Sequence, residues 1–189
     1  MWAGLLTFSA FCYLASSCYV NSTPPVGTWD FSKSRSEDVV GWPSYQQNYI
    51  LLDRIFGTLR LVLPDGNSAT YSNVWALASK NASGSRIDAV ALMFGPESLP
   101  VATAHAQQLL KQWNLDTAGT EASLADWKTM MTGKLPDHVM DPNWQQPFSD
   151  RQRSYITVEI KYGSGLPTPW HLYVTFDFEK FDLGKESAP

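Results

Sequence analysis

The chain has 189 residues, of which 44% are hydrophobic and 17% are charged, and its formal net charge is −4. This composition excludes an intrinsically disordered chain, because disorder goes with low hydrophobicity and high charge, and the length predicts one hydrophobic core. The acidic balance argues against nucleic acid as a partner, since affinity for nucleic acid rests mainly on Lys and Arg side chains that neutralise phosphates.

An apolar run at the N-terminus, residues 1–20, predicts a signal peptide or a membrane anchor. Its apolar and small residues are typical of the apolar region of an export segment, although the usual Lys or Arg at the start is absent. Residues 14–18, LASSC, resemble the cleavage box of bacterial lipoproteins, so Cys18 is the candidate lipidation site. Ala15 stands where leucine is preferred and basic residues are absent from the start, so cleaved secretion, an uncleaved anchor and a misassigned start stay open. We expect a periplasmic or membrane-anchored protein of the cell envelope.

The rest of the chain is predicted to contain a linker and one folded domain. Residues 21–48 combine Pro, Gly and Ser with scattered aromatic residues, which indicates a linker that becomes an N-terminal edge segment. Residues 49–182 form a single α+β domain in this interpretation, and residues 183–189 form a C-terminal tail. Both cysteines lie before residue 21, so the domain forms no internal disulfide and its stability must come from packing.

Strand patterns dominate the first part of the domain. Residues 49–56 fit either a strand or the end of a helix, because the apolar run is too short for periodicity to decide. Leu59, Leu61 and Leu63 alternate with other residues and predict a half-buried strand, which the turn at residues 64–66 joins to a second strand over residues 69–78. Residues 86–94 are apolar on both faces, as in a central strand.

Helical patterns follow. Ser98 is a candidate N-cap for a helix whose apolar residues recur every three or four positions as far as Trp113. His105 lies at the edge of its packed face. Ser123 is the candidate N-cap of a second helix, which Gly133 ends.

Two alternating strands close the chain after a long loop at residues 134–153. They span residues 155–161 and 170–178, and the connector at residues 163–167 predicts an antiparallel hairpin. Strands, two helices and further strands predict an α+β two-layer sandwich, with two helices packed on one face of a mainly antiparallel sheet.

The polar face of this hairpin is the candidate binding surface. Pairing about a short connector places His171 opposite Glu159, Tyr173 opposite Thr157, and Thr175 opposite Tyr155. Tyrosine and histidine supply rigid, amphipathic contact area of the kind found where proteins bind partners. The alternative is a solvated face that cross-strand pairs stabilise. The candidate residues are Tyr155, Thr157, Glu159, His171, Tyr173 and Thr175.

Asp137, His138 and Asp141 in the long loop are weak candidates for a metal site. They offer oxygen and nitrogen ligands but have no recognised spacing, so we expect no metal and no cofactor.

The sequence favours binding over catalysis. It contains no G-x-S-x-G elbow, P-loop, dinucleotide fingerprint or H-E-x-x-H motif. We expect an exported envelope protein that binds a protein partner, for example an immunity-type inhibitor of a secreted toxin, with membrane attachment through the N-terminus left open. The alternatives are a small secreted hydrolase, with a site assembled from the 134–153 loop and the closing hairpin, and a structural envelope lipoprotein.

Overall fold

The computed structural model describes residues 25–43, 50–80, 84, 86–132, 142–147, 155–163 and 168–186. The predicted α+β class is confirmed, since these residues form one sheet of seven strands and four helices. The elements are, in chain order, β1 (Val26–Asp30), α1 (Glu37–Val40), β2 (Leu51–Val62), β3 (Ser68–Lys80), β4 (Ile87–Glu97), α2 (Leu99–Gln112), α3 (Ala118–Thr132), β5 (Trp144–Gln145), β6 (Ile156–Tyr162), β7 (Trp170–Asp177) and α4 (Phe178–Glu186).

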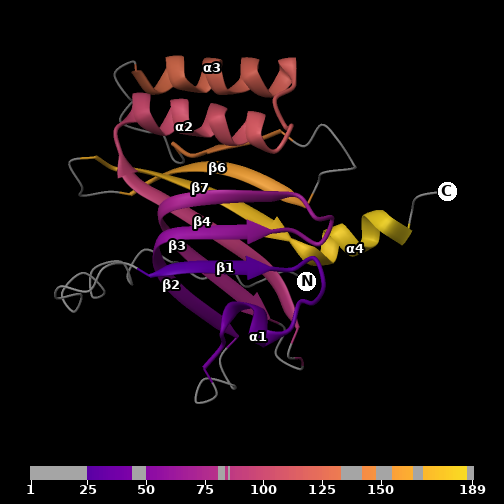
Figure 1. Cartoon of the computed structure of the whole chain (residues 1–189). Helices are drawn as coiled ribbons and strands as arrows, with labels where there is room; N and C mark the ends of the chain where they lie inside the picture. The colour runs from indigo at the N-terminus through magenta and orange to yellow at the C-terminus, as the bar shows by residue number, and fades with distance from the viewer. Residues whose placement is uncertain are drawn as a thin grey trace.

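The sheet is mostly antiparallel. Its strand order is β1-β2-β3-β4-β7-β6-β5, and only β1 and β2 run parallel. Figure 1 shows α2 and α3 stacked beside the β6 and β7 end, whereas α1 lies at the opposite end near β1 and β2. Residues 49–56, which periodicity left open, belong to a strand from Leu51 onward.

Aromatic contacts identify the face of the sheet that α2 and α3 cover. The ring of Trp113, just after α2, lies 5.3 Å from that of Phe176 in β7, and Trp127 of α3 lies 5.3 Å from Trp170. Alternate residues of β6 and β7, beginning with Ile156 and Trp170, are buried. The predicted pair of helices therefore packs against the apolar side of these strands.

The core continues into β2 and β3, where the alternation of buried residues shifts by one position near the middle of each strand, so that the same face of the sheet stays buried. Phe56 and Leu59 are both buried in β2, and Tyr71 and Val74 are both buried in β3. Asn73, between the last two, adopts a left-handed φ of 51° that a regular strand does not allow. The shift keeps Tyr71 on the core side, where the Trp113 indole N–H donates to the Tyr71 hydroxyl at 2.9 Å.

The segment predicted as a linker and edge piece contains an edge strand and a short helix. β1 pairs with the second half of β2, as an edge segment should. Arg35 then joins this segment to the C-terminal end of the domain, because its guanidinium donates to the Phe178 carbonyl at 2.9 Å and pairs with Asp182.

The second helix begins earlier than predicted. α3 starts at Ala118, and the Thr117 hydroxyl before it accepts a hydrogen bond from the Thr120 backbone N–H at 3.1 Å. Ser123 lies inside the helix, where its hydroxyl accepts from the Trp144 indole at 3.2 Å. The predicted cap was wrong because a threonine six residues upstream offers the same chemistry at the actual helix start.

The C-terminal part also differs from the prediction. The last strand ends at Asp177, and Phe178 begins α4, which runs through the boundary predicted for a C-terminal tail. Phe178 nevertheless belongs to the core, with its ring 4.9 Å from that of Phe31.

Several predicted features lie outside the described residues. These are the export segment with Cys18 and the metal candidates Asp137, His138 and Asp141. Of the predicted 134–153 loop, the structure describes residues 142–147, and these include the short strand β5 that pairs with β6. In the described part of the chain, every helix is too short or too polar to cross a membrane.

Candidate recognition surface

Side chains that point away from α2 and α3 form a second face of the sheet, here called the open face. Strand register aligns them in rows across the sheet. One row, here called the aromatic row, contains Ile55, Trp75, Met93, Tyr173 and Glu159 from five neighbouring strands.

Two further rows lie beside the aromatic row. The first contains Asp53, Leu77, Ala91, Thr175 and Thr157. The second contains Leu51, Ser79, Ala89 and Asp177. His171 and Lys161 complete the open face beyond the aromatic row. Except for Met93, all these side chains are exposed or half-buried, whereas the strand neighbours of β6 and β7 that face α2 are buried.

Burial alternates along the closing hairpin as predicted, but the predicted register is wrong. The structure pairs Glu159 with Tyr173, Thr157 with Thr175, and Lys161 with His171. Each predicted pair differs from the observed pair by two residues on one strand. The last pair before the connection is Tyr162 with Trp170, so the connection between the strands is longer than the predicted one. A shift of two keeps every side chain on its face, since strand side chains alternate with period two.

Tyr155 does not belong to the open face. It is 5% exposed, its ring lies 5.0 Å from that of Phe181 in α4, and its hydroxyl donates to Asp65 at 2.8 Å. The prediction was wrong because α4 and the turn between β2 and β3 cover this end of β6, and neither contact is visible in the hairpin sequence.

The apolar centre of the open face was not predicted. Ile55, Trp75, Leu77 and Met93 lie on β2, β3 and β4, outside the closing hairpin. The sequence did contain a sign of this apolar centre. Residues 86–94 are apolar on both faces, whereas the two predicted helices were expected to cover only one face of the sheet, so the other apolar side had to stay without a helix.

The edge of this surface is polar and paired. The Lys161 ammonium lies 3.0 Å from a Glu159 carboxylate oxygen and 4.9 Å from the centre of the Tyr173 ring. The Trp75 indole N–H, in contrast, is buried and has no hydrogen-bond partner among the described residues. The open face thus combines an apolar centre and a charged border.

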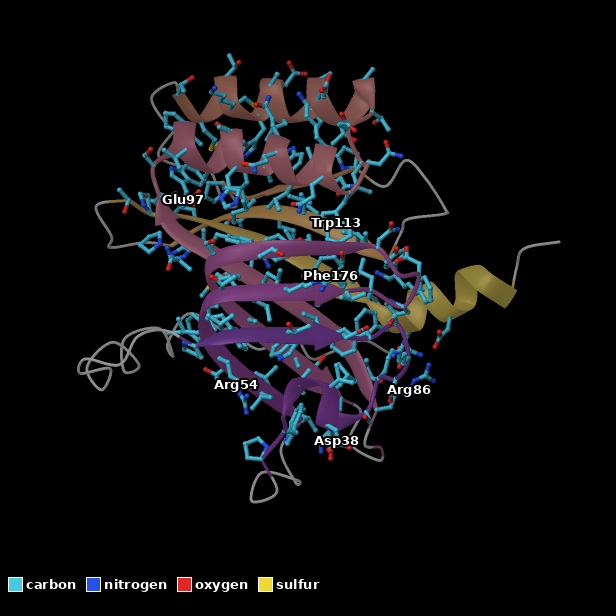
Figure 2. The ribbon with its side chains drawn as sticks, in the orientation of Figure 1. Asp38, Arg54, Arg86, Glu97, Trp113 and Phe176 are labelled. Atoms are coloured by element: carbon cyan, nitrogen blue, oxygen red, sulfur yellow. The ribbon has the colours of Figure 1, made fainter. Side chains whose placement is uncertain are left out.

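A histidine and carboxylate cluster lies where β4 meets α2 (Figure 2). The Glu97 carboxylate lies 3.2 Å from Nδ1 of His105, so this histidine has the acidic partner that helical spacing did not reveal. The second carboxylate oxygen of Glu97 and Nδ1 of His171 are buried, and neither has a hydrogen-bond partner in the part of the chain that the structure describes. In the described residues, His, Cys, Asp and Glu form no group of three or more arranged for a metal ion.

The environment of His171 predicts a pH dependence. Burial lowers the pKa of His171 below its ordinary value of 6.5, and the Glu97 carboxylate opposes this with a smaller effect. The folded protein therefore binds fewer protons than the unfolded chain between these two pKa values. His171 contributes stability at neutral pH that is lost as the pH falls from 6.5 through the lowered pKa.

We expect the urea midpoint to fall more between pH 7.5 and pH 5.5 in the natural protein than in the variant His171→Gln. The glutamine keeps a polar side chain but does not titrate. Equal decreases in the two proteins would show that His171 does not carry this effect.

Comparison with known proteins gives no match. No model of a protein family, no curated protein and no solved structure matches this chain. The function must therefore be argued from the residues of the open face.

Proposed function

We propose that this chain is a binding protein that recognises a protein partner through the open face of its sheet. The observation that supports the proposal is the aromatic row, which places Trp75, Met93 and Tyr173 side by side on the central strands. Aromatic residues and methionine are enriched in the cores of protein interfaces, and charged residues border them. The pair of Glu159 and Lys161 supplies such a border here.

The Trp75 indole supports the same proposal. Its nitrogen is buried, but the residue as a whole is half-buried, so the ring is the part of Trp75 that a partner would contact. Tryptophan and tyrosine are also the residues that contribute most often to interface energy.

In this proposal the export segment at residues 1–20 takes the open face to the cell envelope. An inhibitor that covers the site of a secreted toxin is one version, and the net charge of −4 suits a basic partner.

Site-specific photo-crosslinking in the source cell tests the proposal. A photoreactive phenylalanine analogue in place of Tyr173 is expected to capture one protein reproducibly. The same analogue in place of Lys128, an exposed residue of α3 on the helical side, is the matched control and should not capture it. Capture of the same protein at Lys128 alone would move the interface to the helices and contradict the proposal.

With the captured partner purified, we expect Tyr173→Ala to weaken binding about tenfold or more, since a central aromatic residue contributes on the order of 2 kcal/mol. The same variant should lower the free energy of unfolding by under about 1 kcal/mol, as the loss of a cross-strand contact does. Lys128→Ala should change neither quantity. Titration calorimetry and urea unfolding measure the two effects, and unchanged binding by Tyr173→Ala would rule out the aromatic row as the interface centre.

A further inference from the structure

The first half of β2 is a free strand edge in the described part of the chain. β1 pairs with Thr58 to Val62, whereas Leu51 to Phe56 pair only with β3 on their other side. Three hydrophobic residues here are exposed, namely Ile50 at 57%, Leu51 at 39% and Ile55 at 38%. An exposed strand edge with apolar side chains is a template for pairing with another chain.

Backbone hydrogen bonds on either side show which groups of this edge point outward. The Gly57 N–H donates to the Pro25 carbonyl at 3.0 Å, away from β3, and the Ile50 carbonyl accepts from the Lys80 N–H at 3.1 Å, toward β3. Because successive residues of a strand point their backbone groups to opposite sides, the N–H and C=O groups of Leu51, Asp53 and Ile55 point outward.

The same three residues project their side chains onto the open face, where they begin its three rows. Arg54 between them points to the other side, and its guanidinium donates to the Gly41 carbonyl at 2.5 Å, below the sheet beside α1 (Figure 2). A strand added beside β2 would therefore lengthen the rows of the open face by one residue each.

On the opposite side of the sheet, the short strand β5 and the Asn143 side chain cover part of the β6 edge. The Val158 carbonyl accepts from the Gln146 N–H at 3.0 Å, and the Tyr162 N–H donates to the side-chain oxygen of Asn143 at 2.7 Å. The outer edge of β1 is limited to five residues, and short edge strands resist pairing. The first half of β2 is the edge that is continuous with the open face.

We propose that an extended segment of the protein partner adds to the sheet beside Leu51 to Phe56, and that this segment carries a basic residue flanked two positions away on each side by apolar residues. The basic side chain would lie opposite Asp53, and the apolar ones opposite Leu51 and Ile55. This inference rests on the proposed function and names the chemistry of its partner.

Charge distinguishes this occupant from a second copy of the chain. Antiparallel pairing of two β2 edges about Asp53 would place two Asp53 carboxylates directly opposite each other, and like charges in that position are destabilising. An opposite charge there is stabilising, and the acidic chain attracts a basic segment at longer range as well.

The test uses the full chain and a fluorescein-labelled heptapeptide, Thr-Val-Thr-Lys-Thr-Val-Thr, with blocked ends, and measures binding by fluorescence anisotropy. Asp53→Lys is expected to weaken binding of this peptide at least about fivefold, because it replaces an attractive cross-strand pair by a repulsive one. A peptide with Glu in place of Lys should show the reverse preference. The exchange of preference cannot arise from misfolding of the variant.

N-methylation of the peptide tests whether backbone pairing occurs. In antiparallel pairing the N–H of the peptide lysine points to β2 and that of the neighbouring threonine points away. A methyl group on the lysine nitrogen should weaken binding about tenfold, whereas a methyl group on the threonine nitrogen should have little effect.

Equal affinity of the Lys and Glu peptides for the natural protein, equal effects of the two methyl groups, or a stable dimer of the chain that does not bind peptide would each overturn the inference. Its failure is distinguishable from failure of the proposed function. If the crosslinked partner is lost with Tyr173→Ala but retained with Asp53→Lys, the open face binds the partner without strand addition. If the peptides bind but no partner is captured at Tyr173, the proposed function fails.

Discussion

Replacement of Phe176 by alanine is expected to lower the free energy of unfolding by about 3 to 5 kcal/mol, the range for removal of a buried phenylalanine ring. Phe176 is fully buried in β7 and pairs with Val90 and Ile156 on the two neighbouring strands. Its ring lies 5.3 Å from that of Trp113 at an interplanar angle of 73°. The loss of this ring leaves a cavity between the sheet and α2, as Figure 2 places Phe176 and Trp113 on facing sides of the core.

Thr175→Ala is the matched control, because Thr175 is the preceding residue of the same strand and lies on the open face. We expect it to lower the free energy of unfolding by under about 1 kcal/mol. Urea unfolding followed by circular dichroism gives both values. Similar losses for the two variants would mean that the open face is as well packed as the helical side, which would contradict its assignment as a free surface.

Glu37→Gln is expected to be the second strongly destabilising change, by about 3 kcal/mol, because it removes the carboxylate beside a buried ammonium group. The Lys80 side chain is 5% exposed and pairs with Glu37 of α1. Its ammonium also lies 4.7 Å from the centre of the Trp42 ring. The glutamine leaves a desolvated positive charge facing a neutral amide.

The double variant Glu37→Gln with Lys80→Met tests this explanation. Methionine removes the buried charge and keeps an apolar chain of similar length, so we expect the double variant to recover more than half of the lost stability. Glu121→Gln on the exposed surface of α3 should change the free energy of unfolding by under about 0.5 kcal/mol. A double variant less stable than Glu37→Gln alone would show that the ion pair contributes through more than charge compensation.

Local sequence patterns were sufficient to predict which residues are buried in those strands where the hydrophobic residues alternate regularly. The alternation in residues 155–161 and 170–178 correctly separated core residues such as Leu172 from open-face residues such as Tyr173. The register error of two residues did not disturb this separation, because faces depend only on the parity of positions. The predicted start of α3 was wrong because the Thr117 and Ser123 hydroxyls can both cap a helix. Only the fold around them shows that Thr117 is the residue at the helix start.

Periodicity and turn chemistry are properties of neighbouring residues, so they were enough to predict the α+β class, the positions of most strands and helices, and five of the six residues expected on the polar face of the hairpin. Three features instead depend on contacts between distant parts of the chain: the burial of Tyr155 beneath α4, the proximity of Glu97 to two histidines, and the aromatic row. Each of these depends on strand order, which brings β4 beside β7 although more than seventy residues separate them along the chain. Strand order follows from long-range packing of the whole core, and no local pattern in β2, β3 or β4 specifies which strand lies next to it.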